Sequence, residues 1–151
     1  MMARLVTVCA LTVSCLTVAW GYPSGAPLSA CDTLLPQHNT TAGNNSAFTL
    51  AVEPDKNQDL LVILSSTQEF KGFLISTKGN IAGSFSPVNN RSQVLQCPNR
   101  PAITHSDPEP KSSITVKWIP EGALTPVTFI ATVVTKYHEQ YATDINYSHT
   151  Q

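Results

Sequence analysis

The first 21 residues constrain this chain most, because they read as a leader that sends the rest into an oxidising compartment. Arg4 is the only charged residue among them, and an apolar run over 5–18 follows it. The run leads to Ala-Trp-Gly at 19–21, a small-x-small pattern typical of cleavage sites. It is shorter than the about 20 apolar residues of a membrane span. We expect a signal peptide at 1–21, with a retained anchor as the alternative, and a secreted, extracellular mature chain without a transmembrane segment.

The leader changes the cysteine count, because Cys9 and Cys15 lie within it. Cys31 and Cys97 remain, and two cysteines in an oxidising compartment allow one intramolecular disulfide. Closing a loop of 66 residues between them would contribute about 4 kcal/mol in the chain-entropy description. Two free or intermolecular thiols are the alternative. No CxxC pair suggests a zinc or redox site.

Length and charge favour one small domain over 22–151 that does not bind nucleic acid. The chain has nine basic and ten acidic residues, so removing Arg4 changes the formal charge from -1 to -2. Nucleic-acid binding usually shows as a clustered basic surface. Four Asn-x-Ser/Thr motifs predict a secreted glycoprotein with carbohydrate on loops or the tail. Their asparagines are Asn39, Asn44, Asn90 and Asn146.

Apolar and polar residues alternate in short segments, which predicts strands rather than helices. Eleven prolines also argue against long helices. Strands are expected where residues alternate or form short apolar runs: 46–53, 60–65, 70–77, 93–97, 113–119 and 127–135. Irregular segments are expected elsewhere: an N-terminal arm at 22–45, a loop at 78–91, an exposed connection at 99–111 and a polar C-terminal tail.

Together these patterns predict an all-β fold, an immunoglobulin-like β-sandwich of about seven to nine strands with one disulfide. Trp118 is the candidate core aromatic, although it follows both cysteines in the chain. A barrel is the alternative architecture. Gly72 inside the segment 70–77 indicates a bulge or a close backbone approach.

Several blocks of the mature chain resemble reeler domains. The opening at 22–31 reads YPSGAPLSAC, and Pro-Gln-His follows at 36–38. Later come FKGFLI at 70–75, Thr-His-Ser at 104–106 after Cys97, and two strand blocks at 113–118 and 127–134. The resemblance runs from residue 22 to about 141, in the family order. One departure is Tyr141-Ala142, where many relatives carry a tryptophan.

A stand-alone domain of this kind is most similar to the small secreted insect defence proteins. That resemblance implies a β-sandwich, a disulfide matching Cys31–Cys97 and a role in innate immunity. Some members are thought to bind microbial polysaccharides, while matrix relatives bind glycosaminoglycans. The haem and membrane modules of the reductase-type relatives are not expected here, so their activity is not transferred.

Residues for catalysis or metal binding do not form a recognisable pattern. His38, His105, His138 and His149 lack metal-binding spacing, and the carboxylates form no acid–base pair. We therefore expect no enzymatic activity, no cofactor and no metal. His38 and His105 lie in family-like blocks near the cysteines, and their expected role is to hydrogen-bond backbone groups where the arm docks.

The predicted function is that of a secreted, non-catalytic antimicrobial defence protein that binds microbial surface polysaccharide or lipopolysaccharide. Lys71, Lys78 and Arg91 are candidate ligand-binding residues if they converge in space, although sparse cations usually form a solvated surface. The alternative function is an extracellular-matrix adhesion module for host glycosaminoglycans or cell-surface proteins. A direct membrane-active antimicrobial is disfavoured, because the chain is net acidic.

Overall fold

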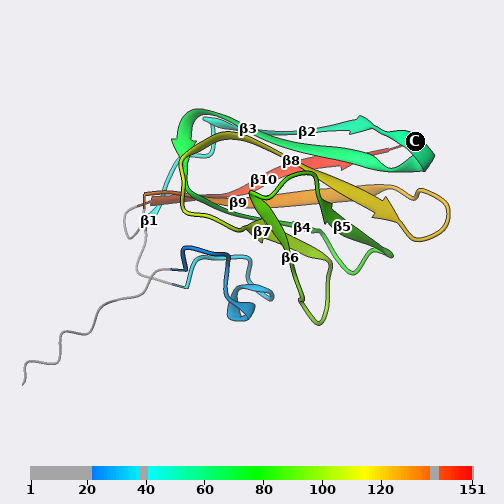
Figure 1. Cartoon of the computed structure of the whole chain (residues 1–151), viewed down its shortest axis with the longest axis horizontal. Helices are drawn as coiled ribbons and strands as arrows, with labels where there is room; N and C mark the ends of the chain where they lie inside the picture. Colours follow the sequence, from blue (N-terminus) through cyan, green and yellow to red (C-terminus); the bar gives the residue numbers. More distant parts are fainter. Residues whose placement is uncertain (1–21, 38–40, 137–139, 151) are drawn as a thin grey trace, which may run out of the picture.

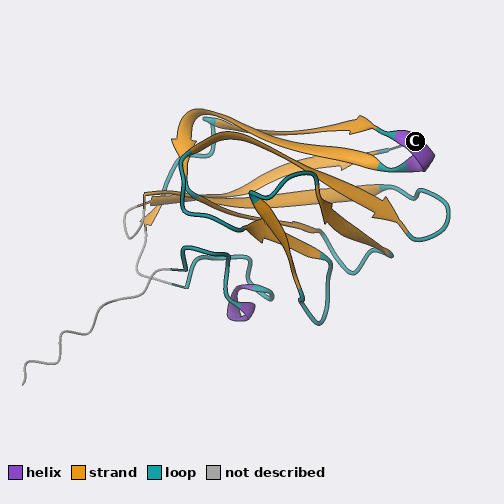
Figure 2. Cartoon of the chain, in the orientation of Figure 1, coloured by secondary structure: helices purple, strands orange, loops and turns teal. Residues whose placement is uncertain are grey.

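Two layers of mostly antiparallel strands face each other in the computed structural model (Figures 1 and 2). It describes residues 22–37, 41–136 and 140–150. The expected signal peptide therefore lies outside the described residues. Ten strands are present in the described part, six in one sheet and four in the other. The predicted all-β sandwich of about seven to nine strands is therefore confirmed, with slightly more strands.

The smaller layer is a four-stranded antiparallel sheet in the order β2-β3-β8-β5. Its strands are β2 (Phe48–Pro54), β3 (Leu60–Phe70), β8 (Lys111–Pro120) and β5 (Gly83–Pro87). The apolar run predicted at 60–65 is a central strand, because β3 pairs with β2 on one side and β8 on the other. A short 3-10 turn, η2 (Lys56–Gln58), joins β2 to β3.

The larger layer is a six-stranded sheet in the order β1-β10-β9-β4-β7-β6. Its strands are β1 (Thr41–Ala42), β10 (Gln140–His149), β9 (Val127–Lys136), β4 (Gly72–Thr77), β7 (Ala102–His105) and β6 (Ser92–Leu95). All neighbours run antiparallel except β1 and β10, which are parallel. This sheet matters most for function, because the N-terminal arm covers its outer face.

The main core fills the space between the two sheets and centres on the predicted tryptophan. Trp118 is 1% exposed. Its ring lies 5.0 Å from that of Phe85 and 5.7 Å from that of Phe129, in edge-to-face geometry. Gly83 has φ 153°, and a Cβ there would overlap the Trp118 ring. Glycine is therefore required where β5 begins.

Four segments expected to be irregular contain strands, and the shortest of these strands is β1 in the predicted arm at 22–45. β5 lies within the predicted loop 78–91, and its one large apolar residue, Phe85, is too little to produce a pattern. β7 lies within the predicted exposed connection 99–111, yet all four of its residues are buried. It has no alternation because it is covered on both faces.

The predicted polar tail is also wrong, since β10 extends from Gln140 to His149. Its buried residues, Ala142 and Ile145, are three positions apart, whereas alternation in a strand has a period of two. A register shift between them, with Asp144 at φ 58°, restores Ile145 to the core side. The extra residue conceals the strand in the sequence.

Candidate binding site: the groove beneath the N-terminal arm

The N-terminal arm, residues 22–37, lies against the outer face of the six-stranded sheet (Figure 1). The disulfide between Cys31 and Cys97 attaches it covalently, as predicted, with the two Cα atoms 5.5 Å apart. The Ala26 N–H donates to Thr104 Oγ1 at 3.0 Å. The Gln93 amide donates to the Ser24 carbonyl. The arm is thus held on β6 and β7 at separate points.

His105 provides another attachment and confirms its expected role at the arm. Its Nε2 lies 3.0 Å from the Tyr22 carbonyl, and its Nδ1 lies 3.3 Å from the Phe73 N–H. The neutral ring satisfies both contacts when Nε2 carries the proton. Burial lowers the pKa of His105, although the Tyr22 and Phe73 backbone contacts oppose that effect. His38, expected to act similarly, lies outside the described residues.

Gly72 allows His105 to occupy this position. A Cβ at Gly72 would lie 3.1 Å from Cε1 of the His105 ring. The close approach expected at this glycine is therefore that of a side chain. Gly25 in the arm has φ 123°, and a Cβ there would lie 2.7 Å from Nε2 of Gln93. Both glycines permit close packing between arm and sheet.

Part of the arm packs tightly on the sheet as a second apolar cluster. Leu34 from the arm contacts a cluster that includes Leu74 of β4 and Ala102 of β7. Leu34 has φ 57°, a left-handed conformation that is uncommon for leucine, and its side chain is buried. Because β4 packs on the main core through Phe73 and on the arm through Leu74, all six of its residues are buried.

Beside this cluster the arm leaves a groove of about 540 Å³, which we call the arm groove. Its volume is within the range typical of small-molecule sites. The sheet side and the far rim are formed by residues of β4, β7, β9, the β3–β4 turn and the β7–β8 connection: Lys71, Gly72, Phe73, Leu74, His105, Pro108, Thr132 and Val134. The other wall is arm residues, mostly proline, alanine and leucine: Tyr22, Pro23, Gly25, Ala26, Pro27, Ala30, Leu34, Leu35, Pro36 and Gln37. Its surface is predominantly apolar.

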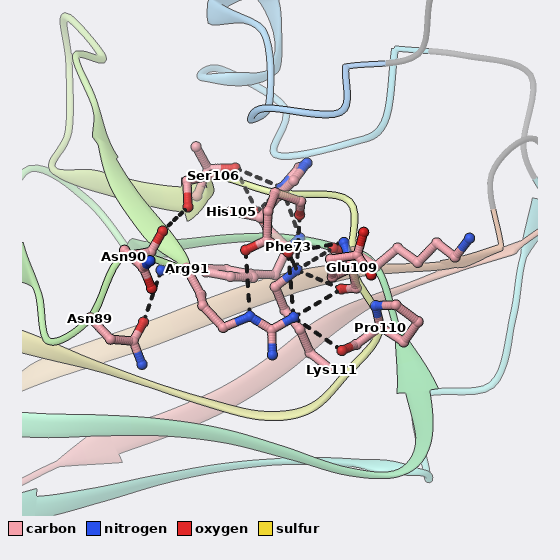
Figure 3. Close-up of polar contacts among 12 residues, drawn as sticks. Phe73, Asn89, Asn90, Arg91, His105, Ser106, Glu109, Pro110 and Lys111 are labelled. Atoms are coloured by element: carbon pink, nitrogen blue, oxygen red, sulfur yellow. Dashed lines mark hydrogen bonds and ion pairs between the residues drawn. The ribbon is translucent and has the colours of Figure 1, made fainter.

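A buried lysine organises the rim of the arm groove (Figure 3). The Lys111 side chain is 0% exposed, and its ammonium lies 3.0 Å from the Asp107 carboxylate. It also donates to the backbone carbonyls of Lys71, Asp107 and Glu109 at 3.1, 2.9 and 2.8 Å. Sparse cations usually form a solvated surface, but Lys111 is buried. The lysine fixes the backbone of Lys71 and the connection that contains Pro108.

Arg91 completes this ionic cluster from the start of β6. Its guanidinium forms an ion pair with Asp107 at 3.3 Å and donates to the carbonyls of Glu109 and Pro110 (Figure 3). Burial tends to raise the pKa of Asp107, but hydrogen bonds from Arg91, Lys111 and the Glu109 N–H outweigh it and hold the pKa at about 2. Burial lowers the pKa of Lys111, and Asp107 opposes that shift.

The three predicted ligand-binding cations do not converge. Lys71 lies at the arm groove. Lys78 is exposed at the opposite end of β4, about 20 Å away at the usual strand rise of about 3.3 Å per residue. Arg91 is engaged with Asp107. The structure therefore brings Lys71 alone to the groove, and the part of each residue in ligand binding stays a prediction.

The predicted glycosylation sites stay predictions as well. Asn44 and Asn90 are exposed in connections between strands. Asn146 is exposed too, but it lies within β10 rather than in a tail. Asn39 lies outside the described residues.

No three His, Cys, Asp or Glu side chains gather into a metal-binding group within the described part of the chain. No helix among the described residues is long and apolar enough to cross a bilayer. Sequence reasoning missed the arm groove itself. The resemblance of the opening at 22–31 was the available signal, because these residues form one wall.

The sequence matches a known protein family over most of its length. The Reeler domain family matches residues 29–147. The chain belongs to the Reeler family. The match spans both sheets and the disulfide, so the family assignment rests on the whole sandwich.

Two kinds of Reeler relative are similar in sequence. The Drosophila melanogaster protein "Defense protein l(2)34Fc" is 32% identical over 133 residues, which cover 80% of this chain and 84% of that protein. The Bos taurus protein "Ferric-chelate reductase 1" is 34% identical over 128 residues, which cover 77% of this chain. The chain spans only 22% of that reductase's length.

Solved Reeler structures share the fold. The human F-spondin reeler domain aligns with a TM-score of 0.59 at 23% identity and covers 78% of this chain and 97% of that domain. The Reelin-N domain of F-spondin aligns with a TM-score of 0.58 at 25% identity and covers 74% of this chain. These likenesses support the sandwich architecture.

Proposed function

We propose that this Reeler chain is a secreted, non-catalytic antimicrobial defence protein that binds lipopolysaccharide or surface glycans of microbes. Its correspondence with the Drosophila defence protein covers most of both chains. The match to the ferric-chelate reductase leaves more than three quarters of that enzyme without a counterpart. Reductase activity is therefore not part of the proposal.

The arm groove is the observation that carries the proposal. It is a preformed cavity of ligand-binding size, with an exposed lysine at its edge. Lipopolysaccharide combines acyl chains with phosphate groups, so it complements both the apolar lining and Lys71. A neutral polysaccharide would complement neither, so the arm groove favours lipopolysaccharide over neutral glycans.

The polar residues around the groove are used for structure, which supports binding without catalysis. Both ring nitrogens of His105 contact backbone groups. Asp107 accepts hydrogen bonds from Arg91 and Lys111. A general acid or base must instead reach a proton on the substrate. Extracellular function is supported by the disulfide, which is typical of oxidising compartments.

Binding to whole cells tests the proposal. Purified protein should sediment with Gram-negative bacteria, and soluble lipopolysaccharide should compete more strongly than a neutral glucan. Added salt should weaken binding, because exposed charges are screened over about 10 Å at 0.1 M. If the protein did not sediment with bacteria at any salt concentration but did bind immobilised heparin, the proposal would be overturned in favour of matrix adhesion.

Single substitutions at the two exposed lysines that flank β4 supply the matched comparison for this experiment. Lys71→Gln should reduce lipopolysaccharide binding, whereas Lys78→Gln at the far end of β4 should leave it unchanged. Arg91 is unsuitable for such a test, because its loss would disturb the Asp107 cluster. Equal losses for both lysine variants would indicate diffuse electrostatic attraction rather than binding at the groove.

A further inference from the structure

Several polar groups of the residues that line the arm groove already have partners within the protein. The Ala26 N–H donates to Thr104 Oγ1, and the Phe73 carbonyl accepts from the same hydroxyl at 2.7 Å. Thr132 Oγ1 lies 3.0 Å from Thr143 Oγ1. In the wall, the Gln37 amide donates to the Leu35 carbonyl at 3.1 Å. The groove therefore presents mainly hydrocarbon to an incoming molecule.

Because these polar groups are already hydrogen-bonded, the groove favours a ligand that brings few polar groups of its own. A sugar ring or an extended peptide would carry hydroxyl or backbone amide groups into the groove. Burying such groups without new hydrogen bonds is costly, and peptide recognition on a sheet normally relies on main-chain hydrogen bonds. A methylene chain has no such requirement.

From these observations we infer that the arm groove binds one acyl chain of an anionic amphiphile, with the head group at Lys71. Lys71 is exposed and is the one charged side chain among the described lining residues, since His105 is neutral in its hydrogen-bonded form. No described acidic residue forms an ion pair with it. Within the described part of the chain, its ammonium is therefore available for a carboxylate or phosphate.

The position of Lys71 is set by the backbone on both sides of the residue. Its N–H donates to the Val134 carbonyl at 3.0 Å, and its carbonyl accepts from the buried Lys111 ammonium. Lys71 thus combines a fixed main chain with a free side chain. That combination suits a residue that receives a head group at the edge of an apolar groove.

This inference deepens the proposed function and rests on it only for the microbial source of the amphiphile. Purified fatty acids test the groove without bacteria or lipopolysaccharide. Failure of fatty-acid binding would overturn the acyl-chain inference and leave the sedimentation result intact. Failure of sedimentation would remove the microbial source while leaving fatty-acid binding intact.

A chain-length series is the first test. Saturated fatty acids of eight to sixteen carbons are titrated below their critical micelle concentrations, with affinity measured by calorimetry. Binding should tighten about fourfold per buried methylene, from the free energy of methylene transfer, until the groove is full. It should then level off. Affinity independent of chain length would overturn the inference, as would no binding.

Filling the groove is the second test. Val134→Trp adds bulk at a lining residue of β9, and Val94→Trp adds the same bulk on β6 outside the lining. Val94 is already 40% exposed, so its variant is a matched control. Dodecanoate binding should fall at least tenfold in the first variant and stay unchanged in the second. Near-ultraviolet circular dichroism verifies that both are folded.

Leu35→Glu is a second route to the same result if Val134→Trp fails to fold. Leu35 is a partly exposed groove residue, so a charge there should spare the fold while opposing an acyl chain. Full dodecanoate binding by a folded groove variant would overturn the inference.

The head-group assignment is tested with the two lysines. Lys71→Gln should weaken dodecanoate binding about two- to fivefold, the loss expected for an exposed ion pair, and Lys78→Gln should not. Neither change should affect dodecanol, which lacks the charge. If Lys71→Gln leaves dodecanoate binding unchanged, or weakens both ligands equally, the head group does not lie at Lys71.

Discussion

The two faces of the six-stranded sheet are packed in different ways. On the inner face, the rings of Phe85, Trp118 and Phe129 contact one another directly, and the core is continuous. On the outer face, the arm contributes a small cluster around Leu34 and Leu74, a disulfide and a few hydrogen bonds. Continuous packing stabilises the sandwich, whereas attachment at separate points leaves room for a groove. One sheet therefore supports both the core and the candidate site.

Trp118→Ala should produce the largest effect, because it leaves a cavity in the continuous core. We expect the free energy of unfolding to fall by about 5 kcal/mol, the upper end of the range for removing a buried aromatic. Urea denaturation followed by fluorescence or circular dichroism measures it. A loss below about 1 kcal/mol would mean that the inner face is not the main source of stability.

Replacing both Cys31 and Cys97 with serine should come next. Losing the constraint on the unfolded chain should cost about 4 kcal/mol, and the freed arm should abolish dodecanoate binding. The sandwich should retain its far-ultraviolet spectrum, which separates this variant from one that unfolds. Peptide mapping of the unreduced parent protein should recover the two cysteines linked. Undiminished binding in the folded variant would show that the disulfide is not needed to keep the groove.

Removing either charge of the Asp107–Lys111 pair at the groove rim should change the free energy of unfolding by a different amount. Asp107→Asn leaves the buried Lys111 ammonium without its counter-ion, so we expect a loss of about 2 kcal/mol, moderated by three remaining carbonyl contacts. Lys111→Met removes the buried charge itself and should cost about 1 kcal/mol or less. Chemical denaturation at pH 7 compares the two. If Lys111→Met lost more stability than Asp107→Asn, the contacts of the lysine would stabilise the fold by more than its burial costs.

The smallest effect should be a pH dependence that comes from the arm attachment. Because burial lowers the pKa of His105 below its ordinary 6.5, the unfolded chain binds more protons at that residue. Its contribution to stability is therefore present above pH 6.5 and is lost as pH falls toward the lower folded pKa. Asp107, with a pKa of about 2, stays ionised through this window.

Thermal unfolding between pH 7 and pH 5 measures this effect. The parent protein should lose stability on acidification, and His105→Gln should show a shallower dependence over the same range. His149 at the C-terminal end of β10 supplies the matched control, and His149→Gln should leave the dependence unchanged. An identical slope in parent and His105→Gln would exclude His105 as its source.

The sequence alone predicted the parts of the fold whose pattern is local. Alternation identified the segments that became β2 and β8, and continuous apolar runs identified β3 and β9. The disulfide followed from the two cysteines outside the leader, and Trp118 was recognised as core. Each of these features depends on local sequence alone. The side chains of a half-buried strand alternate, and the compartment to which the leader directs the chain determines whether its cysteines are oxidised.

Only the tertiary structure decided the features that depend on contacts between distant segments. β7 is buried because the arm covers one face and the core the other, so no alternation marks it. Lys111 is buried because carbonyls from two connections and Asp107 converge on its ammonium. The arm groove exists because a wall from 22–37 is held against a floor from β4 and β9. The sequence by itself determined the strands and the disulfide; long-range packing determined which lysine lies at the groove.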